Sequence, residues 1–453
     1  MLSSGFFGAE SSEVRLLHLT AGAGGMYCGT CLRDNTLAAE LIARGHDVSL
    51  LPVYTPTRTD EPNVSDGHVF FGGISVFLEQ RVPLFRRTPA ILDSLWDAPA
   101  VIKAAAGRGV SVDPKDLGEL TVSMLKGEAG FQAKEIDKLI AYLREQPPYD
   151  VILIPVSLLI GLAPPLKRVL QRPIVCMLQG EDLFLDGLAE DHRSLAKDLI
   201  RAHAPHVDAF LATSDYYADF MAGHLGLDRD TIHTAPIGIH LEGHDPSARD
   251  RKEPFTIGYL ARIAPEKGLA QLAEAYRILR QEKGLPPARL RAAGYLAREH
   301  KPYLQDIQAK LKAWGLGDEF RYVGEVTREA KIAFLRELDV LSVPSPYAEP
   351  KGLYLLEAMA NAVPWVQPRH GAFPEMERRT GGGLLFEPND ANDLAARIMA
   401  LVNDPHLAAK LGRSGADGVK AHYTAARMAE RTLEVYNRVI NLRQRPMAAV
   451  AGA

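Results

Sequence analysis

The sequence predicts an α/β fold made of two successive doubly wound domains. Short apolar runs rich in Val, Ile and Leu alternate with segments whose apolar residues recur at helical spacing, as in parallel strands joined by helices. This alternation weakens into a polar, charged stretch over residues 238–254 and then restarts. A chain of 453 residues is also long enough for about two to three domains.

The first domain is expected over residues 14–245. It opens with the buried strand "VRLLHLT", a glycine-rich turn, a helix with Leu37 and Leu41 on one face and Gly45 as its C-cap, and the strand "DVSLLPVY". Further strands are expected in "DVILIPV", "PIVCML" and "AFLATS". Residues 79–135 show helical patterns without clear strands, which indicates an insertion.

The second domain is expected over residues 254–422. Its strands are predicted in "FTIGYLA", "LRAAG", "RYVG", "VLSVPS" and "PWVQP", each followed by a helical pattern. After "GLLFEP" the chain is expected to be helical to about Arg443. We expect the helix over residues 423–443 to pack back on the first domain, and "RPMAAVAGA" to form a tail.

Composition limits the function classes. Hydrophobic residues make up 47% of the chain and charged residues 24%, which is ordinary for a globular protein. A net charge of −4 argues against nucleic acid as a partner. Three cysteines favour a reducing compartment, and neither a signal-peptide pattern nor a membrane-spanning apolar run is found. We therefore expect a cytoplasmic protein.

Candidate ligand residues stand in loops after predicted strands, where open α/β sheets bind ligands. Arg262 and Lys267 share a helix start and could hold a diphosphate together with backbone amides, or could be a solvated helix start. Glu349 lies in a later loop and Glu357 eight residues further on, within a helix. The alternative for these glutamates is an acidic helix start followed by a surface residue. Gly294, after "LRAA", is a weaker candidate.

These loops together resemble glycosyltransferase family 4, the retaining nucleotide-sugar transferases of the GT-B fold. "EPKGLYLLEAMANAVP" matches the E-x7-E signature of the family, and "ARIAPEKG" matches its Arg…Glu-Lys-Gly loop. The resemblance runs from about Val14 to Leu442. It implies two Rossmann-like domains that face an interdomain cleft, followed by C-terminal helices.

The resemblance implies a role for each position. Arg262 and Lys267 would hold the donor diphosphate, Glu349 would lie against the donor sugar, and Glu357 would accept hydrogen bonds from the ribose. The other residues expected at the donor are Gly352, Leu353, Gly294, Gly24 and Gly25. Fixed cations would replace a metal ion, so neither a metal nor another cofactor is expected. "DRD" (228–230) resembles an Asp-x-Asp metal motif but lies in a polar turn.

The sugar and acceptor side departs from the family pattern. Gln179 stands where family members commonly carry a histidine, and its amide or backbone carbonyl could face the sugar. Glu181 and Asp182 follow the same strand and could bind the acceptor or cap the loop. "QRVPLFRRTP" (80–89) is basic and apolar, so it could contact a lipid at the inner face of the membrane or form a solvated helix.

Cys28 and Cys31 stand at a predicted helix N-terminus, where thiolates are favoured. A dinucleotide site is disfavoured because Tyr27 occupies the third glycine position of G-x-G-x-x-G. Zinc would need a second ligand pair, which Cys176 and scattered histidines such as "HAPH" do not supply. We interpret the thiols as buried or cleft-lining, with a functional dithiol as the alternative.

The sequence thus predicts a retaining glycosyltransferase that moves a hexose from a nucleoside diphosphate sugar to a hydroxyl of a glycan, lipid or small molecule, as in polysaccharide biosynthesis. One alternative is another activity of the GT-B fold, such as a nucleotide-sugar epimerase or a phosphorylase. The other is a non-catalytic sugar-nucleotide-binding protein, which Gln179 suggests. Retention of the two cations and the two glutamates argues against it, because a scaffold need not keep a charged diphosphate site.

Overall fold

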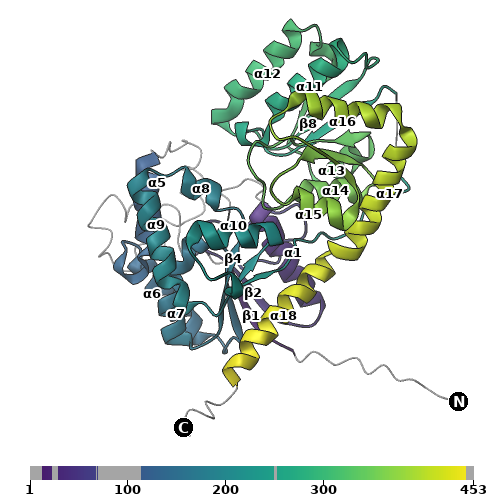
Figure 1. Cartoon of the computed structure of the whole chain (residues 1–453). Helices are drawn as coiled ribbons and strands as arrows, with labels where there is room; N and C mark the ends of the chain where they lie inside the picture. Colours follow the sequence, from purple (N-terminus) through teal and green to yellow (C-terminus); the bar gives the residue numbers. More distant parts are fainter. Residues whose placement is uncertain (1–12, 23–28, 68, 70–113, 249–252, 445–453) are drawn as a thin grey trace, which may run out of the picture.

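Two parallel six-stranded sheets divide the computed structural model into an N-terminal and a C-terminal half (Figure 1). Helices cover both faces of each sheet, so the predicted α/β class with two doubly wound units is confirmed. The structure describes the chain outside residues 1–12, 23–28, 68, 70–113, 249–252 and 445–453.

The sheet of the N-terminal half has the order β2-β1-β3-β4-β5-β6. Its strands are β1 (Arg15–Thr20), β2 (Asp47–Pro52), β3 (Val151–Ile154), β4 (Ile174–Leu178), β5 (Ala209–Ala212) and β6 (Ile232–Thr234). Strands β3, β4 and β5 are buried at every position. Because helices cover both faces, these strands have continuous apolar sequences instead of alternating ones.

The helices of this half pack on both faces of the sheet. They are α1 (Gly29–Ala43), α5 (Pro114–Leu125), α6 (Ala133–Glu145), α7 (Ala163–Leu170), α8 (Asp182–Asp186), α9 (Glu190–His203) and α10 (Asp215–Leu225). Short 3-10 turns are η2 (Gly127–Ala129), η3 (Ser157–Leu162), η4 (Ala204–His206) and η5 (Arg229–Thr231). Helices α5 to α7, α9 and α10 share one apolar core with the sheet, and α1 shares the other.

The sheet of the C-terminal half has the order β12-β11-β10-β7-β8-β9. Its strands are β7 (Thr256–Leu260), β8 (Arg289–Ala293), β9 (Phe320–Gly324), β10 (Val340–Leu341), β11 (Trp365–Pro368) and β12 (Gly383–Phe386). The order reverses between β7 and β10. In doubly wound sheets, ligands bind at this reversal, beyond the carboxyl ends of the two strands.

Helices also enclose the second sheet. They are α11 (Leu269–Gln281), α12 (Lys301–Ala313), α13 (Arg328–Arg336), α14 (Leu353–Ala360), α15 (Phe373–Thr380), α16 (Ala391–Asn403) and α17 (Pro405–His422). Short 3-10 turns are η6 (Pro265–Lys267), η7 (Arg298–His300) and η8 (Gly317–Glu319). One core unites the sheet with α11, α12 and α16, and the other unites it with α13, α14 and α15.

The last helix, α18 (Ala425–Gln444), returns from the C-terminal half and lies along the N-terminal half (Figure 1). Its buried side chains join Leu37 and Leu41 of α1 in a shared apolar core. Where the chain passes from α17 to α18 it runs beside the connection between the halves, because Ile239 exchanges backbone hydrogen bonds with Tyr423 and Ala425.

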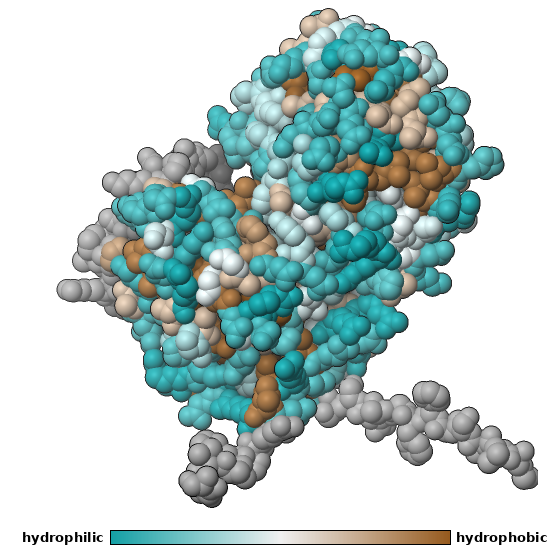
Figure 2. Space-filling model, in the orientation of Figure 1, coloured by the Kyte–Doolittle hydropathy of each residue, from teal (hydrophilic) through white to brown (hydrophobic). Residues whose placement is uncertain are grey.

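Some sequence expectations differ from the structure or fall outside it. Strands β6 and β12 were not predicted, and the strand expected over "VLSVPS" ends at Leu341. Of the expected insertion over 79–135, the structure describes α5, η2 and the start of α6, and residues 80–89 lie outside the described part. No helix within the described part has the length and apolarity needed to cross a membrane. The face shown in Figure 2 is mostly hydrophilic, with apolar side chains in separate patches.

Candidate active site

The loops after β7 and β10 meet at the strand-order reversal. Lys267 ends the turn that follows β7, and Glu349 lies in the loop that follows β10. The Lys267 Nζ donates to Glu349 Oε2, and both side chains are largely buried, with 14% and 8% of their surface exposed. The cation predicted to hold the donor diphosphate and the carboxylate predicted to face the sugar therefore form one ion pair.

Arg262 lies in the same loop but does not join that pair. Its side chain is 42% exposed, and its Nη2 lies 3.0 Å from Glu266 Oε1, an i,i+4 pair. The loop itself is fixed through its backbone, since the Tyr259 hydroxyl donates to the Arg262 carbonyl at 2.9 Å. The guanidinium can thus move to an incoming anion without loss of a buried contact.

Two glycines allow these loops to approach each other closely. Gly268, after Lys267, has a φ of +76°, and a Cβ there would lie 1.9 Å from the Pro344 carbonyl oxygen. Gly294, after β8, has a φ of +138°, and its Cβ would lie 1.9 Å from the Ala261 oxygen. Any larger residue would push the loops apart, because both the space and the backbone conformation require glycine. Gly294 therefore lies against the start of the Arg262 loop.

Helix α14 carries the second glutamate. Gly352 is its N-cap and Leu353 its first residue, so backbone amides of the first turn are available to a ligand. Glu357 is buried within the helix, and its Oε1 accepts a hydrogen bond from Lys331 Nζ at 2.5 Å. The glutamate is therefore not the surface residue that the alternative reading of the sequence proposed.

Sequence reasoning missed Lys331 of α13 and its second partner, Asp60. Lys331 Nζ also lies 2.5 Å from Asp60 Oδ2, and all three side chains are buried. A signal was present, because Lys331 stands four residues before the buried Leu335, on the apolar side of α13. Burial raises the pKa of Glu357, and Lys331 opposes that shift. Burial alone would lower the pKa of Lys331, but the two carboxylates outweigh it and hold that pKa above its ordinary value.

Gln179 and Glu181 follow β4 and make their hydrogen bonds inside the N-terminal half. The Gln179 Nε2 donates to the Pro155 carbonyl at 2.8 Å, while no described group donates to its buried Oε1. Glu181 accepts from the Ser157 hydroxyl at 2.8 Å and from the Gln179 backbone N–H at 2.7 Å. Through these contacts the Glu181 carboxylate fixes the loop that follows β4.

Asp182 reaches the opposite half instead. It accepts hydrogen bonds from Tyr217 at 2.8 Å and from the Tyr347 hydroxyl at 2.7 Å, and Tyr347 belongs to the loop that carries Glu349. The same loop is held at the Pro350 carbonyl, which accepts from the hydroxyls of residues 213 and 214 at 3.1 and 3.0 Å. The Glu349 loop therefore lies where the two halves meet.

The metal and thiol alternatives gain no support from the described residues. Among them, no group of three or more His, Cys, Asp or Glu side chains could hold a metal ion. Cys31 is buried in the first turn of α1, and Cys176 is buried in β4, where burial raises the pKa of its thiol. Asp228 caps η5 by accepting from the Asp230 N–H at 3.0 Å. Gly24, Gly25 and Cys28 lie outside the described residues.

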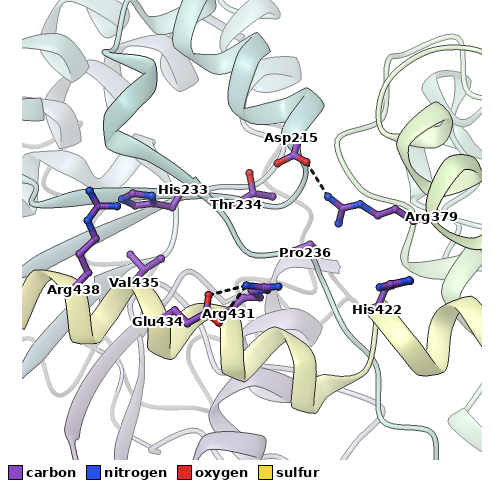
Figure 3. A pocket seen from close by; sticks show the side chains of 10 residues that line it. All are labelled: Asp215, His233, Thr234, Pro236, Arg379, His422, Arg431, Glu434, Val435 and Arg438. Carbon is purple, nitrogen blue, oxygen red and sulfur yellow. Dashed lines mark hydrogen bonds and ion pairs between the residues drawn. The ribbon is translucent and has the colours of Figure 1, made fainter.

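A separate cavity of about 520 Å³ opens between the halves beside α18 (Figure 3). Its lining combines acidic and basic side chains, with Arg379 turned to Asp215 and Arg431 paired with Glu434. The lining residues are Asp215, His233, Thr234, Pro236, Arg379, His422, Arg431, Glu434, Val435 and Arg438. None of the predicted donor residues lines it, so it is distinct from the site at the strand-order reversal.

Two glycosyltransferase family models match this chain. The model of "Glycosyl transferases group 1" matches residues 243–417, and that of "Glycosyl transferase 4-like domain" matches residues 33–238. D-inositol 3-phosphate glycosyltransferase of Pseudarthrobacter chlorophenolicus is 29% identical over 51% of this chain and 56% of its own length. Alpha-maltose-1-phosphate synthase of Mycolicibacterium smegmatis is 30% identical over 51% and 63%. The match thus spans little more than half of these relatives.

Solved structures resemble nearly the whole chain. Sucrose-phosphate synthase of Thermosynechococcus elongatus matches 95% of this chain and 100% of its own, with a TM-score of 0.71 and 18% identity. HepE of Anabaena, solved with UDP and glucose, matches 94% and 100%, with a TM-score of 0.65 and 16% identity. These likenesses confirm the predicted GT-B fold.

Proposed function

Because the chain belongs to the glycosyltransferases of family 4, we propose that it moves a hexose from a nucleoside diphosphate sugar to an acceptor hydroxyl and retains the anomeric configuration. The observation that carries this proposal is the buried pair of Lys267 and Glu349 at the strand-order reversal, with Arg262 in the same loop. A cation, a carboxylate and an exposed guanidinium in neighbouring loops suit a diphosphate leaving group attached to a sugar.

The roles follow from the charges that develop in the reaction. The leaving diphosphate gains negative charge, which Lys267, Arg262 and the amides of the α14 N-terminus would stabilise. Glu349 would then turn from Lys267 to the sugar hydroxyls and favour the positive character of the ring. Glu357 would hold the ribose. Since fixed cations carry the leaving charge, we expect activity to persist in EDTA.

The similar proteins support a nucleoside diphosphate sugar as the donor more strongly than they support any one acceptor. HepE has been solved with UDP-glucose, which supports a uridine donor for this fold. One named relative is a D-inositol 3-phosphate glycosyltransferase and another is a synthase of alpha-maltose 1-phosphate, so we propose an acceptor hydroxyl on a glycan, a lipid or a small molecule. A cytoplasmic location belongs to the same proposal. Residues 80–89 stay a candidate contact to a lipid-linked acceptor, with a solvated helix as the alternative.

A thermal-shift screen of UDP, ADP, GDP and their sugars tests donor binding, because a ligand that binds only the folded chain raises the melting temperature. Turnover of the selected donor, with NMR of the product anomer, then tests catalysis and retention. Lys267→Ala and Arg262→Ala should each lower kcat/KM about 10²–10³-fold. Lys310→Ala, at an exposed position of α12, is the control. Binding without turnover would favour a non-catalytic sugar-nucleotide-binding protein, and an inverted product would contradict retention.

A further inference from the structure

A buried lysine joins the two halves of the molecule at the glutamate assigned to the ribose. Lys331 of α13 donates to Glu357 of α14 in its own half and to Asp60, which follows β2 in the N-terminal half. The three side chains are 8–10% exposed. A lysine costs free energy to bury unless its charge is paired, so the two carboxylates are the reason that Lys331 can occupy this place.

We propose that Lys331 is a positioning residue for the Glu357 carboxylate, and that Asp60 brings the N-terminal half to the same ribose site. The inference rests on the proposed function, in which Glu357 binds the ribose hydroxyls. Lys331 fixes one oxygen of Glu357, Oε1, and among the described residues no group donates to the other, Oε2. That oxygen is left to accept a hydrogen bond from the ribose.

The charge of Lys331 also affects the ionisation of the Glu357 carboxylate and hence the strength of the hydrogen bonds that it accepts. A buried carboxylate without a cation beside it gains a proton, and a protonated carboxyl gives weaker hydrogen bonds to hydroxyl donors. The ammonium at 2.5 Å opposes this protonation by lowering the pKa of Glu357 against the effect of burial, and it holds the carboxylate in one orientation. Lys331 thus acts on the nucleotide through Glu357, without touching the nucleotide itself.

A second bridge runs beside the first. Arg328 stands one turn before Lys331 on α13, and its Nη1 lies 3.0 Å from Glu61 Oε1. The two adjacent acidic residues of the N-terminal half thus meet two basic residues spaced i,i+3, which lie on one side of a helix. Arg328 also donates to the carbonyls of His240 and Glu242 in the connection between the halves. The residues of α13 that join the two halves therefore include the lysine that holds Glu357.

Ribose discrimination tests the positioning role. The affinities of the full chain for UDP, ADP and GDP are compared with those for their 2′-deoxy and 3′-deoxy forms, and the nucleotide that binds most tightly is used. The wild-type chain should bind the ribose form about 10–100-fold more tightly, as expected for a hydrogen bond to a charged group. In Lys331→Met this ratio should fall to within about 3-fold, whereas Lys331→Arg and the exposed control Lys310→Met should keep it.

Asp60→Asn separates the two parts of the proposal. It should weaken both the ribose and the deoxy forms by the same factor, about 3–10-fold, and leave their ratio unchanged, because Lys331 still holds Glu357. Equal affinity of Asp60→Asn and the wild type would overturn the role of the N-terminal half. A wild-type ratio in Lys331→Met would overturn the positioning role.

A double variant keeps the test decisive if Lys331→Met does not fold. Lys331→Met with Glu357→Gln leaves no charged carboxylate at position 357, and its ratio of ribose to deoxy affinity should equal that of Glu357→Gln alone, because both changes act on that ratio through one interaction. Its overall affinity should be lower only by the factor seen in Asp60→Asn, since the contact of Lys331 with Asp60 is lost as well. A ratio that falls further in the double variant than in Glu357→Gln would contradict the proposal. Failure of the underlying function gives a different result, since none of the three ribonucleotides would then bind the wild-type chain.

Discussion

Two glutamates eight residues apart share one chemistry but lie in different surroundings. Glu349 is paired with Lys267, a residue that the donor diphosphate would draw away as it binds. Glu357 is paired with Lys331, which is held in turn by Asp60. In the proposed function the ligand would release the first carboxylate, whereas the second would stay in place. One residue type would then serve the reacting sugar in a loop and the ribose in a helix.

Charge-removing changes at these two positions should have different kinetic effects. Glu349→Gln should mainly lower kcat, by about 10²-fold or more, because positive character develops on the sugar only in the transition state. Glu357→Gln should mainly raise the donor KM, since the ribose contact is the same in the ground and transition states. Steady-state kinetics with the donor found by the screen measure both. A KM effect at Glu349 with loss of kcat at Glu357 would reverse the assignment.

The sequence predicted those candidate site residues that a local pattern marks, namely residues in loops that follow strands. Lys267 and Glu349 stand in loops after strands, and the structure brings them together. Lys331 carries only the signal of its place on the apolar side of α13, and its pairing with Asp60 could not be found in this way, because that contact joins positions 271 residues apart. For Glu181 the sequence left acceptor binding and loop capping open. The hydrogen bond from Ser157 favours a role in the loop, and no local pattern reveals that contact.

A buried histidine should make folding stability depend on pH. His18 in β1 lies 2.9 Å from the Tyr436 hydroxyl, and burial together with nearby Arg33 lowers its pKa to about 3. The unfolded chain binds a proton near pH 6.5 while the folded chain does not, so stability is lost as pH falls below 6.5. Between pH 7 and 5 this group should cost about 2 kcal/mol in urea unfolding.

His18→Asn should remove that part of the pH dependence, and His406→Asn, at an exposed position, should not. The free energies of unfolding at pH 7 and pH 5 are compared for each variant and the wild type. An unchanged difference in His18→Asn would show that other groups cause the acid sensitivity. His244, whose pKa burial and nearby cations lower to about 4, should contribute a remaining slope of the same sign and nearly the same size between pH 7 and pH 5.

Among the elements, central strands were easier to predict than edge strands. Strands β6 and β12 both end their sheets, and β6 has only three residues, with two polar ones, His233 and Thr234. A strand with one neighbour and one buried residue carries little apolar pattern, so its pairing is decided by the rest of the sheet. The fully buried β3, β4 and β5 have the continuous apolar sequences that predict a parallel strand.

The turn between β7 and α11 should require glycine at position 268, because the loop that follows β10 lies against it. Gly268→Ala should place a Cβ 1.9 Å from the Pro344 oxygen and displace the adjacent Lys267, so donor KM and kcat should both worsen by about 10-fold or more. Gly315→Ala is the matched control, because Gly315 has a nearly equal φ, +74°, and open space around it. Both variants should lose about 1 kcal/mol from the left-handed backbone alone. Equal kinetics in the two variants would contradict the close-approach argument.

On the scale of the whole molecule, the chain crosses between the halves twice. It passes from the N-terminal to the C-terminal half near Ile239 and returns along α18, and the two crossings are hydrogen-bonded to each other. Polar contacts add to this link, among them the Arg379–Asp215 pair at 2.8 Å. The apolar side of α18 predicts that this helix packs on the molecule. The surface that receives it is made by the first sheet and α1, which are distant in the sequence, so local pattern does not reveal it.

The returning helix should therefore stabilise the half from which it is most distant in sequence. Tyr436 of α18 is fully buried against the N-terminal half, so Tyr436→Ala should cost about 3–5 kcal/mol of unfolding free energy. Leu442→Ala, on the same helix but 58% exposed, should stay within about 0.5 kcal/mol of the wild type. Urea unfolding measures both. In Tyr436→Ala, amide hydrogen exchange should speed up in peptides of β1 and α1 and remain slow in those of β7 and β8. Equal loss of protection in both sheets would instead mean that the halves unfold as a single unit.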